Sequence, residues 1–173
     1  MFNVFDEEDN PNPTVVHTYV VRRRLMANSS FNPNVTRSHG IGVAFQSMQA
    51  WNKCSNFEGT TCGAAAHAVI IALEELLKHP DDLDENWMIE TRCQYLVDTL
   101  QTGSTRSSMC STCRFNGDPA HVAVVRRLLR RFPRPVRILH QIEKDEKARR
   151  LAFTAVRRLY GKGDSDCSDE EQR

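Results

Sequence analysis

The sequence lacks any long apolar segment. A membrane-spanning helix needs about 18 or more consecutive apolar residues, and no window of this chain approaches that length. Residues 1–13, MFNVFDEEDNPNP, contain neither the basic part nor the apolar part of a secretory signal. We therefore expect no membrane partner and a cytoplasmic or nuclear location. In those compartments the six cysteines should be reduced, buried or metal-bound rather than paired in disulfides.

The chain also lacks internal repeats and has few aromatic residues, which make up 8% of its 173 positions. Its hydrophobic content of 40% and charged content of 26% lie near the averages for globular proteins. A chain of this length buries roughly two thirds of the surface that it exposes when unfolded. One domain of ordinary size is therefore expected, and no disulfide is needed for it to fold.

Charge is distributed very unevenly along the sequence, although the formal net charge is only +1. Residues 1–121 carry 9 Lys/Arg against 14 Asp/Glu, residues 122–162 carry 13 against 3, and residues 163–173 carry 1 against 5. The middle segment therefore has a net charge of +10. Such a segment suits a phosphate-rich or acidic partner.

Hydrophobic periodicity predicts a mainly helical chain. Helices are indicated at 62–79, at 84–100, after the capping pair Asp118-Pro119 as far as Phe132, and over roughly 141–160. The β-branched residues from Thr14 onward predict one strand, and residues 40–51 fit a strand or a helix start equally well. The expected fold is mainly α (α+β), with about four helices and a small N-terminal β element organised around a structural zinc.

Cys110 and Cys113 have the spacing of a zinc knuckle, in which two thiolates of one tight turn occupy adjacent corners of a tetrahedron. A redox-active pair has the same spacing. Because one CxxC supplies only half of a zinc site, two more ligands must come from elsewhere. Cys93 lies on the apolar side of its predicted helix, and His121 faces inward from the first turn of the next one. We therefore predict a zinc site made by Cys93, Cys110, Cys113 and His121.

A second group of candidate ligands, Cys54, Cys62 and His67, is harder to interpret. On a helix that begins near Cys62, the side chains of Cys62 and His67 project about 140° apart, so they cannot both face one metal. Cys54 and Cys62 can instead complete a site with Cys110 and Cys113, which leaves Cys93 in the core. The sequence does not decide between the two pairings.

An enzymatic alternative places a cysteine nucleophile at the start of an apolar helix, where the helix dipole lowers the pKa of a thiol. Cys62 occupies that position, and His121 follows it in the order found in papain-like cysteine proteases. The helix-start signal at Asp118-Pro119 argues against this alternative, because the base of such proteases opens a strand. Our preferred expectation is that the chain is not an enzyme.

The basic segment predicts a surface for RNA or other nucleic acid. Arginines at positions i, i+1, i+4 and i+5 form a stripe that can meet successive phosphates, whereas few aromatic residues are available for base recognition. The predicted contact residues are Arg126, Arg127, Arg130, Arg131, Arg134, Arg137, Arg149, Arg150, Arg157 and Arg158.

In overall plan, Cys110, Cys113, His121, the arginine-rich helix and the charged tail resemble the small cysteine-rich, zinc-binding regulatory proteins of RNA viruses. That resemblance implies an RNA-binding viral accessory factor that suppresses RNA silencing or host defence. A third alternative is an adaptor that docks a host protein. The expected parts are a flexible acidic arm (1–13), one zinc-stabilised helical domain with basic C-terminal helices (14–162) and a disordered acidic tail (163–173).

Overall fold

The computed structural model describes residues 13–22, 37–114, 116–141 and 143–158. Its strands are β1 (Thr14–Arg22), β2 (Arg37–Phe45), β3 (Lys53–Gly59), β4 (Trp87–Thr91) and β5 (Arg137–His140). Its helices are α1 (Thr61–Leu77), α2 (Gln94–Thr102), α3 (Pro119–Leu129) and α4 (Glu146–Arg158), and two 3-10 turns lie at Gln49–Trp51 and Pro80–Asp82. The predicted tail, and all but the last residue of the predicted arm, lie outside the described residues.

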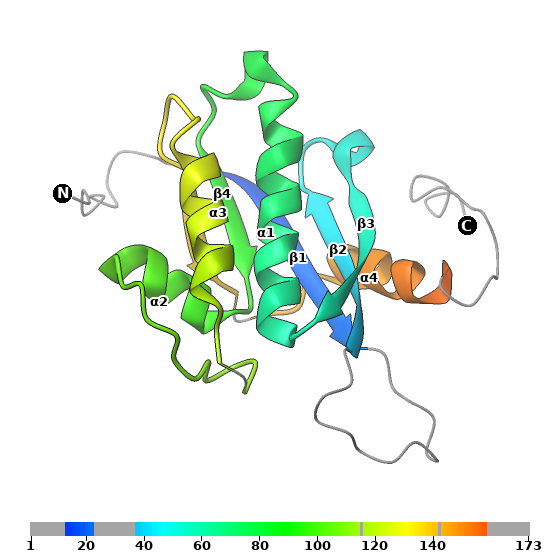
Figure 1. The fold of residues 1–173 in the computed structure, drawn as a ribbon. Coiled ribbons are helices and arrows are strands. Elements are labelled where there is room, and N and C mark those ends of the chain that lie inside the picture. The colour runs from blue at the N-terminus through cyan, green and yellow to red at the C-terminus, as the bar shows by residue number, and fades with distance from the viewer. Residues whose placement is uncertain (1–12, 23–36, 115, 142, 159–173) are drawn as a thin grey trace.

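The five strands form one mixed sheet in the order β3-β2-β1-β4-β5 (Figure 1). β1 pairs antiparallel with β2, with Thr18 opposite Val43, and β2 pairs antiparallel with β3. On its other side β1 runs parallel to β4, with Val16 opposite Ile89, and β4 runs parallel to β5. Because β1, β4 and β5 run parallel to one another, their carboxyl ends lie at the same end of the sheet.

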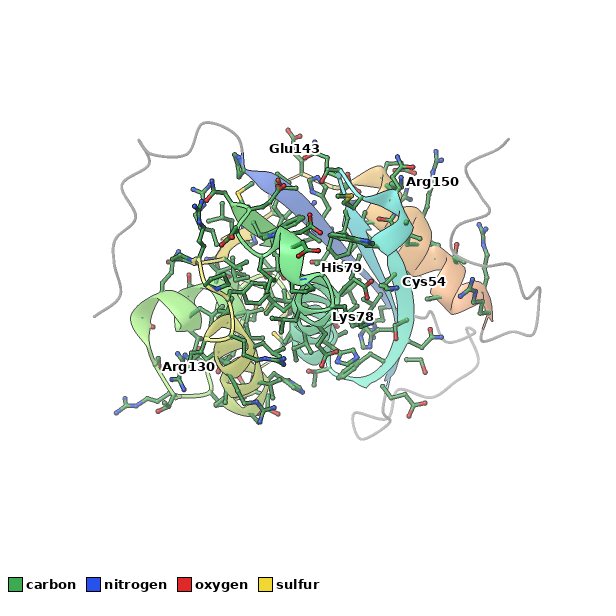
Figure 2. All side chains as sticks on the ribbon, turned by 90° about the horizontal axis from the view of Figure 1, so that it is seen from above. Cys54, Lys78, His79, Arg130, Glu143 and Arg150 are labelled. Carbon is green, nitrogen blue, oxygen red and sulfur yellow. The ribbon has the colours of Figure 1, made fainter. Side chains whose placement is uncertain are left out.

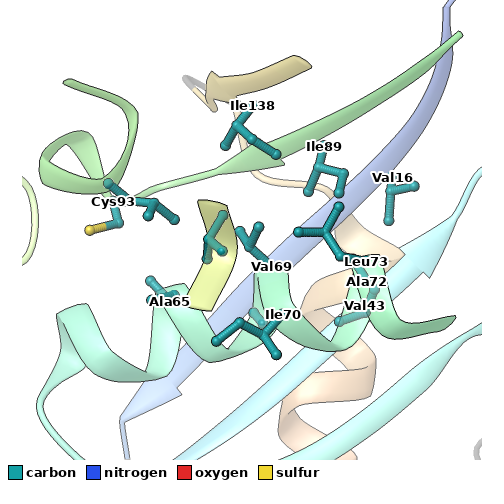
Figure 3. Close-up of a cluster of buried hydrophobic side chains, with 14 of the residues drawn as sticks. Val16, Val43, Ala65, Val69, Ile70, Ala72, Leu73, Ile89, Cys93 and Ile138 are labelled. Carbon is teal, nitrogen blue, oxygen red and sulfur yellow. The ribbon is translucent and has the colours of Figure 1, made fainter. Parts of the chain in front are cut away.

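Helices cover both faces of this sheet, with α1 and α3 on one face and α4 on the other (Figure 1). Because side chains alternate along a strand, each face has its own core. Val16, Val43 and Ile89 pack with Val69 and Leu73 of α1 in the larger core, which Figure 3 shows. The smaller core joins Tyr19 and Ala44 to the inner side of α4.

α1 begins where the sequence predicts a helix. The Thr60 hydroxyl accepts a hydrogen bond from the Gly63 amide at 3.0 Å, which satisfies one of the free amides of the first turn. The predicted inner side, Ala65, Val69, Leu73 and Leu76, is fully buried. The amino end of α1, with Cys62, lies at the end of the sheet where β4 ends.

α4 lies unusually close to β2. A Cβ atom added at Gly40 or Gly42 would overlap the backbone carbonyl oxygens of Ala152 and Ala148, respectively. Small residues on both elements therefore let the helix backbone touch the strand. Asp145 fixes the start of α4, because its carboxylate accepts the Ala148 amide at 2.8 Å.

The predicted fold class, a mainly helical domain with a small β element, is wrong. The segment predicted as one helix, residues 84–100, divides into β4 and α2, and residues 40–51 form most of β2 and a 3-10 turn. β3 and β5 were not predicted at all. β4 and β5 are only five and four residues long, and they are stabilised by parallel pairing with distant segments, which local periodicity does not reveal.

Candidate metal centre and arginine surfaces

Four cysteines from three parts of the chain meet at the end of the sheet where the carboxyl end of β4 lies. Cys62 is the second residue of α1, Cys93 is the N-cap of α2, and Cys110 and Cys113 lie in the segment between α2 and α3. One sulfur from each can ligate a metal, and all four lie within 4.8 Å of one another. Cys62, Cys93 and Cys110 are buried, and Cys113 is partly buried.

The spacing of the sulfurs fits a tetrahedral metal ion. Four sulfurs about 2.3 Å from a zinc ion, at the corners of a tetrahedron, lie about 3.8 Å apart. The Sγ of Cys93 lies 3.6 Å from that of Cys62 and 3.9 Å from that of Cys110. These separations are far longer than the roughly 2.05 Å of a disulfide bond. The four cysteines are therefore clustered so that they could bind a metal such as zinc.

Two backbone amides also point at one of the sulfurs, that of Cys110. The amides of Tyr95 and Cys113 each donate to the Cys110 Sγ at 3.5 Å. Such N–H groups stabilise a thiolate, and they fix the tight turn that presents the CxxC pair. Nearby, the Gln94 amide donates to the Thr112 hydroxyl at 3.2 Å, which ties the start of α2 to the same turn.

The thiols do not ionise alike. Hydrogen bonding with Cys110 and Cys113, together with burial, raises the pKa of Cys62 and of Cys93. Hydrogen bonding with Cys113, Cys62 and Cys93 lowers the pKa of Cys110. Four thiolates cannot share this volume without a cation, so protons and a metal ion compete for the same sulfurs.

The cluster combines members of both pairings that the sequence left open. Cys93, Cys110 and Cys113 are together, and the fourth member is Cys62 rather than His121. His121 lies at the start of α3, where its Nδ1 is 4.0 Å from the Asp118 carboxylate and its ring meets that of Phe57 edge-on. Cys54 lies on β3 and packs against the smaller core, on the opposite side of the sheet.

The arginines predicted to bind nucleic acid are divided between two sides of the molecule. Those of α3 lie on the side of α1, and those of α4 lie across the sheet, as the positions of Arg130 and Arg150 in Figure 2 show. They do not form one continuous surface. Arg137 belongs to β5, at the edge of the sheet.

Four arginines at the end of α3 and just beyond it are exposed, and we call them the α3 arginine patch: Arg127, Arg130, Arg131 and Arg134. Within the described residues, none of the four takes part in an ion pair. Arg126 differs, because its guanidinium donates to the carbonyl oxygens of Thr99 at 2.6 Å and Ser104 at 3.1 Å. It joins α3 to the end of α2 instead of facing solvent.

The α4 arginines are partly occupied within the protein. Glu146 pairs with Arg149 at 3.3 Å and with Arg150 at 3.5 Å. The Arg158 guanidinium donates to the Cys54 Sγ at 3.3 Å, and the Arg149 guanidinium lies over the Phe153 ring. Arg149, Arg150 and Arg158 of α4 therefore already have partners within the protein, whereas the α3 arginine patch takes part in no ion pair within the described residues.

Carboxylates are not gathered in the same way. Among the described residues, the four cysteines are the single group of three or more His, Cys, Asp or Glu side chains whose ligand atoms all come within 4.8 Å of one another. Two carboxylates do approach the His17 ring, which lies 2.9 Å from Glu90 and 3.8 Å from Asp145. That ring separates the two carboxylates.

The cysteine-protease alternative is contradicted by the fold, and the site itself gives a physical reason. Cys62 is buried among three other sulfurs, and its pKa is raised rather than lowered. An activated nucleophile needs the opposite pKa shift and an accessible sulfur.

As for membrane association, none of the helices in the described part of the chain combines the length and apolar character that crossing a bilayer demands.

The sequence matches no family model and no curated protein. Solved structures do match. LC11-RNase H1, in complex with an RNA/DNA hybrid, is 16% identical with a TM-score of 0.59, over 85% of this chain and 99% of that chain. RNase H1 of the archaeon Halobacterium salinarum is 19% identical with a TM-score of 0.54, over 83% and 98%. Prototype foamy virus protease-reverse transcriptase gives 14% and 0.52, over 82% and 20%.

These matches correct three expectations. The resemblance to small zinc-binding regulatory proteins of RNA viruses is wrong, because the likeness to the two RNases H1 covers 85% and 83% of this chain. The function drawn from it, an RNA-binding accessory factor or silencing suppressor, and its adaptor alternative are overturned by the same likeness. The expectation that the chain is not an enzyme is contradicted too, since the neighbours are RNases H. A five-stranded mixed sheet in this order, with four helices, gives the chain an RNase H-like fold.

Proposed function

We propose that this chain is an RNase H-like domain that binds RNA/DNA hybrids and carries a structural zinc ion. The observation that supports hybrid binding is the likeness, over 85% of this chain, to an RNase H1 solved with such a hybrid. Hybrid binding by this fold is consistent with the net charge of +10 over residues 122–162. A duplex presents a regular array of phosphates, and arginine is well suited to contact them.

The α3 arginine patch is the proposed contact surface. Its four side chains are exposed and are not neutralised by ion pairs within the described residues. They lie on the side of α1 and α3, and α3 begins beside the segment that carries Cys110 and Cys113. The α4 arginines contribute less in this proposal, because two of them pair with Glu146.

Zinc is the proposed occupant of the four-cysteine cluster. A site made only of thiolates is soft and selects zinc over the hard cations Mg²⁺ and Ca²⁺. The Sγ separations of 3.6 and 3.9 Å match a tetrahedral S₄ site. With all four positions taken by protein, such an ion has no place for water or substrate, so its role would be structural.

Hybrid binding is tested by titrating a fluorescent RNA/DNA hybrid, with double-stranded DNA and double-stranded RNA of the same sequence for comparison. The double variant Arg130→Gln/Arg131→Gln should weaken hybrid binding and flatten the salt dependence by about one unit of slope for each phosphate that the variant no longer neutralises. The matched control is Arg150→Gln/Arg157→Gln on α4, which removes the same charge. Equal losses of affinity in both variants would argue against a defined surface on α3.

Hydrolysis of the RNA strand is a second candidate function, favoured by the RNase H neighbours. Nucleases commonly use two metal ions, whose usual ligands are carboxylates. The described residues bring no group of three or more carboxylates within 4.8 Å of one another, so hybrid binding is the better supported proposal. Incubation of an end-labelled hybrid with Mg²⁺ or Mn²⁺ decides: cleavage products that disappear in EDTA establish hydrolysis, and an intact hybrid rejects it.

A further inference from the structure

We infer that metal binding at the four cysteines controls nucleic-acid binding by the α3 arginine patch, because the cysteine-bearing segment is what positions α3. This inference rests on the proposed hybrid binding for its functional consequence. The structural coupling between the cysteines and α3 does not depend on that proposal, and it can be measured separately. Its basis is a continuous series of contacts from the sulfurs to α3.

The first step of the series links α2 to the CxxC turn. Cys93 caps α2, and the next two residues bond to the turn, Gln94 through Thr112 and Tyr95 through the Cys110 Sγ. A metal ion held by Cys93, Cys110 and Cys113 would close this part of the chain into one unit. Without it, the turn keeps the two hydrogen bonds just described, one to a hydroxyl group and one to a sulfur.

The second step runs from the CxxC turn to the start of α3. Met109 forms an isolated antiparallel bridge with Asn116, and the Gly117 amide donates to the Ser108 carbonyl at 2.9 Å. The Ser107 hydroxyl donates to the Gly117 carbonyl at 2.6 Å. The two arms of this small hairpin flank the CxxC pair. Its second arm ends directly at Asp118, which caps α3 by accepting the Ala120 amide.

The third step holds α3 at its middle. The Arg126 guanidinium donates to Thr99 in the last turns of α2 and to Ser104 just after α2. The Tyr95 ring packs so closely on Gly117 that a Cβ atom there would overlap it, and the Tyr95 hydroxyl donates to the Arg106 carbonyl at 3.1 Å. α3 is therefore anchored at its start and at Arg126, in both cases to the segment that the cysteines close.

The consequence follows from how the α3 arginine patch is placed. Arg127 directly follows Arg126, and the other three residues lie within eight positions of it. If loss of metal loosens the 93–118 segment, the anchors at both points of α3 loosen with it. Phosphate contacts made by several arginines at once depend on a fixed helix. We expect metal removal to weaken hybrid binding about tenfold, within the range usual for coupling between two sites.

The experiment compares the zinc-loaded protein, the protein stripped by a chelator under reducing conditions, and the stripped protein refilled with Zn²⁺. Each sample is titrated with the RNA/DNA hybrid, and amide hydrogen exchange is measured over residues 119–129 and, for reference, over α4. The inference predicts faster exchange in α3 but not in α4 on stripping, with a parallel loss of affinity that Zn²⁺ restores. Unchanged exchange in α3 after complete metal removal would overturn it.

Two variants distinguish the steps. Cys113→Ser removes the least buried ligand and should reproduce the stripped state. Arg126→Met keeps all four cysteines but removes the bonds to Thr99 and Ser104, so hybrid affinity should fall and should depend less on zinc. A protein whose α3 exchange responds to zinc but which binds no hybrid in any state supports the coupling and rejects the proposed function. Hybrid binding that ignores zinc while α3 exchange changes overturns the control that we infer.

Discussion

The Sγ of Cys62 lies 3.6 Å from the Sγ of Cys93, although the two residues are 31 positions apart in the sequence. Cys62 lies in the first turn of α1, and Cys93 is the N-cap of α2. The contact therefore joins the amino ends of two helices at the end of the sheet where β4 ends. Cys62 is the member of the cluster that we did not assign to the predicted zinc site. Its role is therefore the sharpest test of the centre.

We expect Cys62→Ser to remove metal binding. Its metal affinity should fall by more than the roughly 10- to 100-fold that is typical when a residue hydrogen-bonded to a ligand, and not the ligand itself, is replaced. Bound zinc is counted by native mass spectrometry, and Co²⁺ substitution reports a tetrahedral thiolate site by its visible absorption. His121→Gln serves as the control and should bind metal normally. A normal metal content in Cys62→Ser, with none in His121→Gln, would reinstate the site predicted from the sequence.

Gly42→Ala should destabilise the protein strongly, because the added methyl group would overlap the Ala148 carbonyl oxygen and the Ala152 amide nitrogen. Both atoms belong to the backbone of α4, so neither can move alone. We expect a loss of about 1–3 kcal/mol in the free energy of unfolding, as for other overpacked sites. Urea denaturation measures it, with Asn56→Ala at an exposed position of β3 as the control. A variant as stable as the wild type would show that α4 does not contact β2 this closely.

Glu75 should make stability depend on acid pH. Burial raises the pKa of this carboxyl, but hydrogen bonds from Lys78 and His79 and the nearby Lys53 charge outweigh burial, so the pKa is lowered below 4.5. A carboxyl with a lowered pKa contributes stability that is present above its unfolded pKa and is lost as pH falls through the folded value. Glu75→Gln should therefore cost about 1–2 kcal/mol at neutral pH.

The same variant predicts how that cost changes with pH. The difference in unfolding free energy between wild type and Glu75→Gln should shrink steadily as the pH falls below about 4.5, the ordinary value for Glu. Chemical denaturation at a series of pH values measures it, and Glu74→Gln, at the neighbouring exposed position, is the matched control. A difference that grows on acidification would mean that burial, and not the surrounding cations, dominates at Glu75.

Gly117 and Tyr95 should be strongly non-additive. Gly117→Ala places a methyl group inside the space of the Tyr95 ring, whereas Tyr95→Ala removes that ring together with its bond to Arg106. In the double variant the clash is absent, so we expect a coupling energy of about 0.5–3 kcal/mol. A double-mutant cycle of unfolding free energies measures it. Additive effects would show that the ring does not rest on Gly117.

Local signals in the sequence predicted much of the framework that carries the site. The cap and first residue of α3, Asp118 and Pro119, are confirmed, and Asp118 accepts the Ala120 amide as expected. The inner face of α1 is also confirmed. In both cases a capping residue or a 3.6-residue period lies within one short stretch, so no distant partner is needed to recognise it.

The sheet could not be predicted in the same way, because its strands depend on partners far away. Ile89 is fully buried and pairs with Val16 and Ile138, positions 73 residues before it and 49 after it. Its own surroundings in the sequence also fit a helix. Cys62 appeared only in the alternative pairing with Cys54 for a related reason: its partner Cys93 lies 31 positions away at the start of α2, and no local signal connects the two residues.

The four-cysteine cluster has a consequence for how the chain reaches its fold. Cys62 and Cys93 are 31 positions apart, and Cys93 and Cys110 are 17 positions apart, so an ion bound early would tie these segments into closed loops. Each closure removes configurational freedom from the unfolded ensemble before β4 has found β1. Zinc would then shorten the search for the parallel pairings, which are otherwise the slowest contacts of the molecule to form. Refolding should be faster with the ion than without it.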